Sequence, residues 1–189
     1  IDDISTPVTG TRVPGVSVST VHYLYENLVR PLHLTEQGAV VMHGSAVVSA
    51  AGALVFLAQS GYGKSTLVSY LASHGYPLLT DDSFVLSLAQ VGTLVHPGPA
   101  AVRLWDDSLQ ALQLQGGSYQ PGGDYTSKNQ VSALGRLPSS DIPAPLAAVY
   151  LLGDGSALEP TLCPLQGAAA FVGISEHQFF LPVENKEKY

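Results

Sequence analysis

Positive charge is scarce in this sequence. Its 189 residues contain 8 lysines and arginines against 15 aspartates and glutamates, which gives a formal net charge of −7. Proteins that bind nucleic acid through their surface place lysines and arginines against the phosphates that they contact. The composition therefore argues against a nucleic-acid surface. It also predicts that any anion site is local and built mainly from backbone N–H groups.

Cysteine is almost absent as well. Cys163 is the only one, which excludes an intrachain disulfide and a cysteine-based metal cluster. The longest apolar stretch, residues 39–58, contains His43 and several glycines and serines. We interpret it as two strands around a turn and not as a membrane span. We find no signal-peptide pattern and expect a cytoplasmic protein without membrane contact.

The remaining composition is typical of a globular protein. Hydrophobic residues make up 46% of the chain and charged residues 12%, which is enough apolar material for a continuous core. We expect one domain over residues 1–189. Because the chain begins with Ile1 and not with methionine, we also expect that terminal parts of a longer protein are missing.

Hydrophobic periodicity predicts an α/β fold. Apolar residues at helical or alternating spacing, bounded by glycine and proline, separate the elements. The expected helices cover residues 21–34, 64–74, 106–114 and 167–174. The expected strands cover residues 40–42, 46–48, 54–57, 77–80, 83–88, 93–95 and 147–152. The glycine-rich segment 116–124 is either a mobile substrate loop or a plain surface connection.

The most informative motif reads Ala-Gln-Ser-Gly-Tyr-Gly-Lys-Ser over residues 58–65, between a predicted strand and a predicted helix. This is the setting of a phosphate-binding loop, in which backbone N–H groups and a helix N-terminus face the phosphates. Lys64 would neutralise the β- and γ-phosphate oxygens, and the Ser65 hydroxyl would hold Mg²⁺. The residues expected to contact the nucleotide are Ser60, Gly61, Tyr62, Gly63, Lys64, Ser65 and Thr66.

The loop departs from the usual pattern at its first position. Ala58 stands where GxxxxGK[ST] has a glycine, and alanine disfavours a positive φ. Gly61 and Gly63 remain, so we expect that the turn still closes.

Two adjacent acids follow the helix. Asp81 and Asp82 come at the end of a short predicted strand, where the backbone can turn both carboxylates toward one cleft. One could accept the proton of an acceptor hydroxyl while the other contacts Mg²⁺. The alternative is that one acid holds the metal and the other caps the next turn.

Few other residues could take part in phosphate chemistry. His43, between two apolar strands, could hydrogen-bond a phosphate or an acid, or could be a structural histidine. Arg103 could meet transition-state charge, or could form a surface ion pair with a neighbouring aspartate. Lys128 and Arg136 could reach a phosphate or the acceptor, although ordinary solvated charges are the simpler interpretation.

The stretch from His43 to Asp82 resembles the HPr serine kinase/phosphorylase family and its smaller HPr kinase-like relatives. The shared features are a strand-borne His-Gly, the GxSGxGKS-type loop, a following helix, a Gly-Tyr pair at 75–76 and the Asp-Asp pair, in the same order and spacing. The later Pro-Gly-Pro at 97–99 and Arg-Leu-Trp at 103–105 are similar to the kinase-like relatives, some of which accompany biosynthetic clusters for modified peptides. The resemblance covers about residues 21–155.

The resemblance implies a P-loop core with a mixed β-sheet flanked by helices, like the C-terminal domain of HPr kinase. It implies ATP and Mg²⁺ as cofactors, with Lys64 and Ser65 on the phosphates and the metal. By the same resemblance, Asp81 is the general base, Asp82 assists the metal and His43 lines the phosphate site. The sequence has no Glu-Ile-Arg-Gly stretch, which argues against phosphorylase activity and against HPr as the substrate.

These features predict an ATP-dependent kinase that phosphorylates a hydroxyl group, with a serine of a peptide or small protein as the leading acceptor. Alternatives are a small-molecule hydroxyl kinase and a nucleotide-binding regulatory or assembly module that transfers nothing. The chain lacks the Leu-Ser-Gly-Gly-Gln stretch of ABC-type ATPases and the Asn-Lys-x-Asp motif of Ras-like GTPases. The sequence leaves open whether the protein forms a homo-oligomer.

Overall fold

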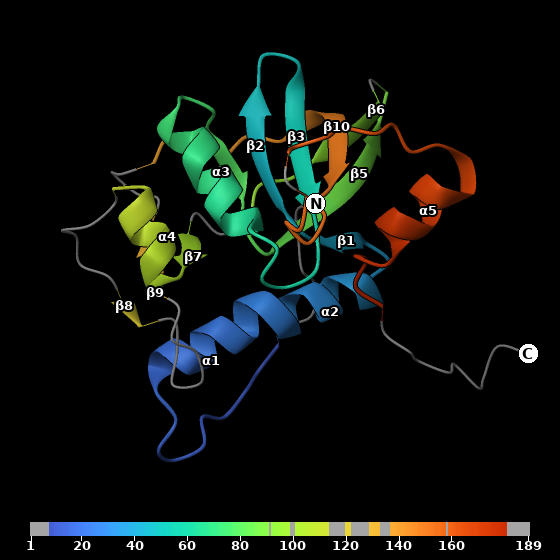
Figure 1. The fold of residues 1–189 in the computed structure, drawn as a ribbon. Helices are drawn as coiled ribbons and strands as arrows, with labels where there is room; N and C mark the ends of the chain where they lie inside the picture. The colour runs from blue at the N-terminus through green and yellow to red at the C-terminus, as the bar shows by residue number, and fades with distance from the viewer. Residues whose placement is uncertain are drawn as a thin grey trace, which may run out of the picture.

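A mixed β-sheet forms the centre of the molecule, and helices lie against it on several sides (Figure 1). The computed structural model describes residues 8–90, 92–98, 101–113, 120–121, 129–132, 137–157 and 159–180. The helices are α1 (Val18–Leu24), the π-helical turn η1 (Tyr25–Val29), α2 (Arg30–Glu36), α3 (Lys64–Ser73), α4 (Asp106–Ala111) and α5 (Gly167–Ser175). The first strands are β1 (Val40–His43), β2 (Ser45–Ser49), β3 (Gly52–Leu57), β4 (Leu78–Thr80) and β5 (Ser83–Ala89). The later strands are β6 (Gly92–Val95), β7 (Ala101–Leu104), β8 (Gln120–Pro121), β9 (Asn129–Ser132) and β10 (Ala144–Leu151).

The strands form one seven-stranded and one three-stranded sheet. The larger sheet has the order β1-β5-β6-β10-β3-β2-β4, and the smaller has the order β7-β9-β8. Only the β10–β3 pair is parallel among the pairs of the described strands. β10 joins the two halves of the larger sheet, because its first residues pair with β6 and its later ones with β3.

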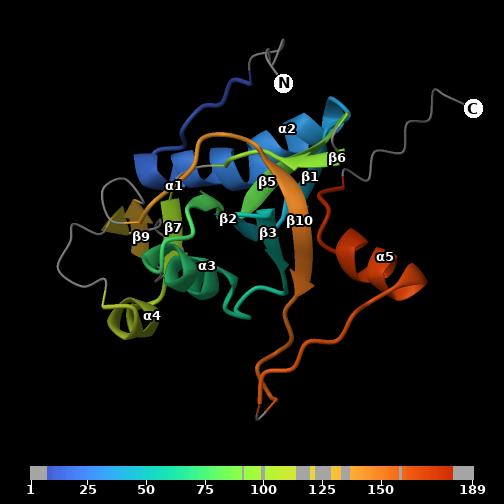
Figure 2. The same ribbon diagram turned by 90° about the horizontal axis from the view of Figure 1, so that it is seen from above.

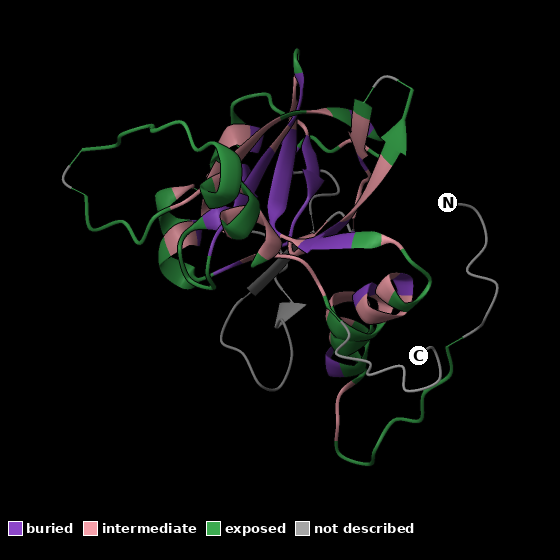
Figure 3. Cartoon of the chain, turned by 90° about the vertical axis from the view of Figure 1, so that its right-hand side faces the viewer, coloured by how far each residue is buried: buried purple, intermediate pink, exposed green. Residues whose placement is uncertain are grey.

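The central hairpin β2–β3 has both faces covered, so its strands are almost continuously apolar (Figure 3). Side chains alternate between the faces of a strand. In β3, Leu54 and Phe56 therefore belong to the core beneath α3, while Val55 and Leu57 belong to the core on the opposite face. Seen from above, α3 and α4 lie on one side and α1 and α2 along another (Figure 2).

The N-terminal helical segment differs from the sequence-based expectation. The chain shows no regular structure over residues 8–17, and α1 begins at Val18, with the Ser17 hydroxyl accepting a hydrogen bond from the Thr20 N–H (3.2 Å). The sequence predicts that Pro31 ends or kinks this helix; instead, Pro31 lies at the start of α2, which continues to Glu36. The widened π-helical turn precedes it, and proline fits at the start of the next helical segment because no backbone donor is required there.

The other expected helices and strands are found with boundaries shifted by up to a few residues. Helix α3 follows the phosphate-loop motif as expected, and β4 ends directly before Asp81. Helix α4 ends at Ala111, short of the expected 114. Of the glycine-rich segment 116–124, only the backbone of β8 lies within the described residues, and Lys128 and Arg136 lie outside them. Within the described ranges, no helix has the length and apolarity needed to cross a membrane.

Gly44 allows β1 and β2 to turn close to β3. A Cβ atom at this position would lie 2.6 Å from Leu57 Cδ2 and 2.8 Å from the carbonyl oxygen of Phe56. The Gly44 N–H also donates to the carbonyl oxygen of Asp82 (3.1 Å). Gly44 thus holds the end of β1 against the connection between β4 and β5.

We predict that Gly44→Ala lowers the free energy of unfolding by about 1–3 kcal/mol, because the added methyl group meets backbone that cannot move cheaply. Gly153→Ala is the control, since a Cβ at that position meets nothing within 4 Å. Urea denaturation of both variants measures the difference. Equal stabilities for the two variants would show that the β1–β2 connection can move away from β3.

Candidate functional site

A cavity of about 480 Å³ opens where the β3–α3 loop, the end of β1 and the β4–β5 connection meet. The loop and the start of α3 provide Ser60, Gly61, Gly63, Lys64, Ser65 and Thr66. His43 reaches the cavity from β1, Asp82 from the β4–β5 connection and Arg103 from β7. The remaining wall is formed by Tyr23 of α1 and by Trp105, Asp107 and Ser108 at the start of α4.

The β3–α3 loop closes through two glycines in the left-handed region. Gly61 has φ = 91° and Gly63, the N-cap residue of α3, has φ = 82°. Residues other than glycine rarely adopt such φ values. Ala58 is not among the described residues with positive φ, so alanine at the first motif position does not strain the loop.

Lys64 is the buried cation of the loop. Its side chain is largely covered, with the residue 8% exposed. Its Nζ donates to the carbonyl oxygens of Ala58 (2.7 Å) and Gln59 (3.2 Å). The ammonium group is therefore held over the loop by main-chain acceptors.

The two adjacent aspartates have different surroundings. Asp81 is 3% exposed and does not line the cavity. Its Oδ1 accepts hydrogen bonds from the hydroxyls of Ser45 (2.5 Å) and Ser65 (3.0 Å). Its Oδ2 accepts one from the backbone N–H of Arg103 (3.4 Å). Asp81 thus reaches the cavity only through the Ser65 hydroxyl that it orients.

Asp82 faces the cavity. Its backbone has φ = 85°, a conformation that aspartate adopts more readily than most residues. Its carboxylate forms an ion pair with the guanidinium of Arg103. The reversal of the chain at Asp82 directs the second carboxylate to the front of the site, while the first stays behind it.

Arg103 links the acid to the N-terminal helix. Its guanidinium lies over the ring of Tyr23, 4.2 Å from the ring centroid, which is a cation–π arrangement. The ion pair that the sequence suggested, with a neighbouring aspartate of α4, is replaced by the pair with Asp82. Tyr23 was not predicted as a site residue, because its helical spacing is that of any residue on an amphipathic helix.

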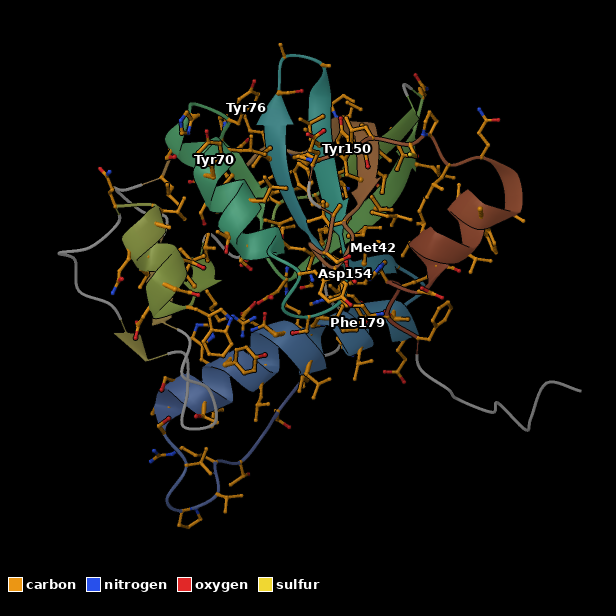
Figure 4. All side chains as sticks on the ribbon, in the orientation of Figure 1. Met42, Tyr70, Tyr76, Tyr150, Asp154 and Phe179 are labelled. Carbon is orange, nitrogen blue, oxygen red and sulfur yellow. The ribbon has the colours of Figure 1, made fainter. Side chains whose placement is uncertain are left out.

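His43 is kept neutral by its surroundings. Burial, followed by the nearby Lys64 ammonium, lowers its pKa from 6.5 to about 4, against a smaller raising effect of Asp81. Its ring makes an edge contact with Phe179 (centroids 6.3 Å apart), and the backbone N–H of His43 donates to the carbonyl oxygen of His177 (2.6 Å). Phe179 belongs to the segment after α5 that pairs with β1 (Figure 4). At neutral pH, His43 can therefore donate or accept a hydrogen bond but adds no positive charge to the site.

The structure brings most of the predicted site residues to one cavity. The exceptions are Asp81, which lies behind Ser65, and Tyr62, which is 40% exposed at the tip of the loop and does not line the cavity. Trp105, Asp107 and Ser108 were not singled out from the sequence as site residues. The roles of all of these residues in binding and catalysis remain predictions.

The oxygen atoms around Ser65 are of the kind that Mg²⁺ takes as ligands. The described residues contain no group of three or more histidine, cysteine, aspartate and glutamate side chains that could hold a metal on its own. Mg²⁺ is usually held by one or two protein oxygens together with phosphates and water. Ser65 and the Asp81 carboxylate that accepts its hydrogen bond would supply oxygens of this kind.

The comparisons with known proteins give a weak likeness to a solved structure. The sequence matches no protein-family model and no curated protein. Among solved structures, the chain is similar to the Hpr(Ser) kinase/phosphatase from Coxiella burnetii, with 17% sequence identity and a TM-score of 0.33. The match covers 39% of this chain and 54% of that chain, so it spans about half the length of the solved protein. A likeness of this size carries no assignment of activity.

We predict that His43 makes the protein less stable in mild acid. Because its pKa is lower in the folded than in the unfolded state, its contribution is complete above pH 6.5 and is lost as the pH falls from 6.5 through 4. The loss amounts to about 2–3 kcal/mol by pH 4. Urea denaturation at several pH values should show a flatter profile for His43→Gln than for the unmodified protein.

His74→Gln provides the control for this comparison, since His74 is an exposed histidine at the end of α3. It should keep the pH profile of the unmodified protein. Identical profiles for the protein with and without His43 would contradict the low pKa.

Proposed function

We propose that this chain is an ATP-dependent kinase that transfers the γ-phosphoryl group to a hydroxyl, with a serine of a peptide or small protein as the acceptor. One observation carries the proposal. A loop closed by two left-handed glycines holds Lys64 and the N-terminus of α3 at one wall of a cavity, and Asp82 and Arg103 line the same cavity. Anion-binding groups and an acid thus face a common space.

The loop supplies the phosphate-binding groups. Gly63, the N-cap residue, has no side chain to accept hydrogen bonds from the first N–H groups of α3, so these groups can point to an anion. The Lys64 ammonium can exchange the carbonyl oxygens of Ala58 and Gln59 for phosphate oxygens. Bonds between a cation and an anionic oxygen are stronger than bonds to a neutral carbonyl, which favours the exchange.

The surroundings of the two acids favour a division of roles opposite to the one that the family resemblance implies. We propose that Asp81 holds Ser65, and through it Mg²⁺, because both of its carboxylate oxygens accept hydrogen bonds and it is 3% exposed. We assign the role of general base to Asp82, since a base must reach the acceptor hydroxyl and Asp82 lines the cavity.

Arg103 completes the proposed mechanism. In phosphoryl transfer, catalysis depends mainly on positioning and on cations that meet the charge of the transferring group. When the γ-phosphate enters the cavity, Arg103 moves from Asp82 to the phosphate oxygens. This movement also releases the carboxylate that accepts the proton of the acceptor hydroxyl.

Lys64→Ala tests nucleotide binding. Loss of a charge-assisted contact to the phosphates should weaken Mg·ATP binding at least about tenfold, as measured by calorimetry. Arg30→Ala is the control, because it also removes one positive charge but lies on α2, paired with Glu26 outside the cavity. If well-folded, unmodified protein binds no Mg·ATP, the proposed function is wrong.

Asn substitutions of the two acids separate their roles. We expect Asp81→Asn to raise the Mg²⁺ concentration needed for ATP binding, because Ser65 loses its partner. We expect Asp82→Asn to retain ATP and Mg²⁺ affinity and to slow transfer at least about 100-fold, which is the usual contribution of a general base. Transfer is measured with γ-labelled ATP against separate pools of peptides and of small-molecule metabolites.

The outcomes distinguish the alternatives. Labelling of metabolites alone would replace the peptide acceptor by a small molecule. Tight binding of ATP without labelling of either pool would favour a nucleotide-binding module. Full transfer by Asp82→Asn, together with loss of transfer and unchanged Mg²⁺ dependence in Asp81→Asn, would return the role of base to Asp81.

A further inference from the structure

We propose that Trp105 and Asp107 form the nucleoside subsite of this cavity, in which the indole ring of Trp105 stacks on the base of the nucleotide. The inference rests on the proposed function, because it needs a nucleotide in the cavity. The proposed subsite would supply the nucleoside contacts that the β3–α3 loop does not supply. The loop recognises phosphates through its backbone and cannot by itself distinguish a nucleotide from an inorganic polyphosphate.

A hydrogen bond between α3 and α4 places the start of α4 beside the phosphate-loop motif. In a loop of this sequence type, Lys64 serves the β- and γ-phosphates, while backbone N–H groups cradle the α- and β-phosphates. Thr66 lies one step further into α3 than Ser65, and its hydroxyl hydrogen-bonds the Ser108 hydroxyl of α4 (3.0 Å). The start of α4 is therefore tied to the first turn of α3, and both border the same cavity.

Charged residues of both signs line the cavity. Arg103 and Trp105 both line the cavity and lie two residues apart at the end of β7, or about 7 Å along an extended chain. Next to Arg103, the negative charge of Asp82 is balanced by the guanidinium. Asp107 is two residues from Trp105 in the chain and lines the same cavity, and a carboxylate there repels phosphate but accepts hydrogen bonds from nucleoside N–H or O–H groups.

The two side chains are suited to these contacts. Trp105 is 44% exposed although it lines the cavity, so its large ring offers apolar area to a ligand. Asp107 is held by its neighbour, since its Oδ1 accepts hydrogen bonds from the Ser108 N–H (2.6 Å) and the Ser108 hydroxyl (3.3 Å). A stacking ring beside an oriented hydrogen-bond acceptor is a common arrangement for recognising a nucleobase and its ribose.

Trp105 is also a built-in probe, because it is the only tryptophan in the chain. The test titrates the full chain with Mg·ATP and with magnesium tripolyphosphate, which has the phosphates but no nucleoside. Tryptophan emission and calorimetry are recorded for both. We expect ATP to quench the emission and to bind roughly 5- to 150-fold more tightly than tripolyphosphate, which corresponds to the usual contribution of base stacking.

Three variants make the test specific. Trp105→Ala should remove most of the preference for ATP over tripolyphosphate and leave the affinity for tripolyphosphate unchanged, while Trp105→Phe should keep more of the preference. Asp107→Asn should also reduce the preference for ATP. Tyr76→Ala is the control: Tyr76 is 39% exposed, does not line the cavity and lies near the end of α3 remote from the loop (Figure 4).

The outcomes distinguish failure of the proposed nucleoside subsite from failure of the proposed function. If Trp105→Ala keeps the full preference for ATP, or weakens both ligands equally, the nucleoside subsite is elsewhere although the phosphate site stands. If the unmodified protein binds both ligands equally, the cavity has no nucleoside subsite. If it binds neither ligand, the proposed function fails and the subsite fails with it.

Discussion

The buried carboxylate of Asp81 connects three parts of the molecule that are far apart in the sequence. It accepts hydrogen bonds from Ser45 at the start of β2, from Ser65 in the first turn of α3 and from the backbone of Arg103 in β7. A charged group that is almost completely buried must have such partners, since an unsatisfied buried carboxylate is very costly. The position of the β3–α3 loop relative to both sheets therefore depends on this one side chain.

A second set of contacts joins the N-terminal helix to the same site. Tyr23 supports the guanidinium of Arg103, and Arg103 pairs with Asp82. The described residues contain four lysines and arginines, namely Arg12, Arg30, Lys64 and Arg103, and two of these four line the cavity. These two cations share the cavity with the carboxylates of Asp82 and Asp107.

The sequence predicted the local features of this arrangement and missed the long-range ones. Continuous runs of apolar residues located β2 and β3, and the Gly-Lys-Ser run located the start of α3, because both depend on neighbouring residues. The sequence also suggested that Asp81 and Asp82 share one cleft. Their different environments follow from the positive φ at Asp82, which hydrophobic periodicity does not predict.

The sequence likewise did not predict which elements β1 and α1 contact. β1 precedes β2 directly, yet it pairs with β5 and bridges to the segment after α5. Tyr23 reaches Arg103 from a helix 80 residues earlier in the chain, as the two residue numbers give. Such pairings depend on how the whole core packs, so a local pattern carries no signal for them. Tyr23 and the α4 residues were missed as site residues for this reason.

Both cations of the cavity are held by acceptors that a phosphate could replace. Lys64 rests on two neutral carbonyl oxygens and Arg103 on the carboxylate of Asp82. On the proposed function, the two exchanges differ in their consequences. Transfer of Lys64 to the phosphate oxygens strengthens nucleotide binding only. Transfer of Arg103 to these oxygens also exposes the carboxylate of Asp82, which would activate the acceptor. Asp82 would then be available as a base only while a phosphate holds Arg103, which links proton abstraction to the presence of the nucleotide. His43 adds no competing positive charge to this exchange, because burial and the Lys64 ammonium keep its pKa at about 4.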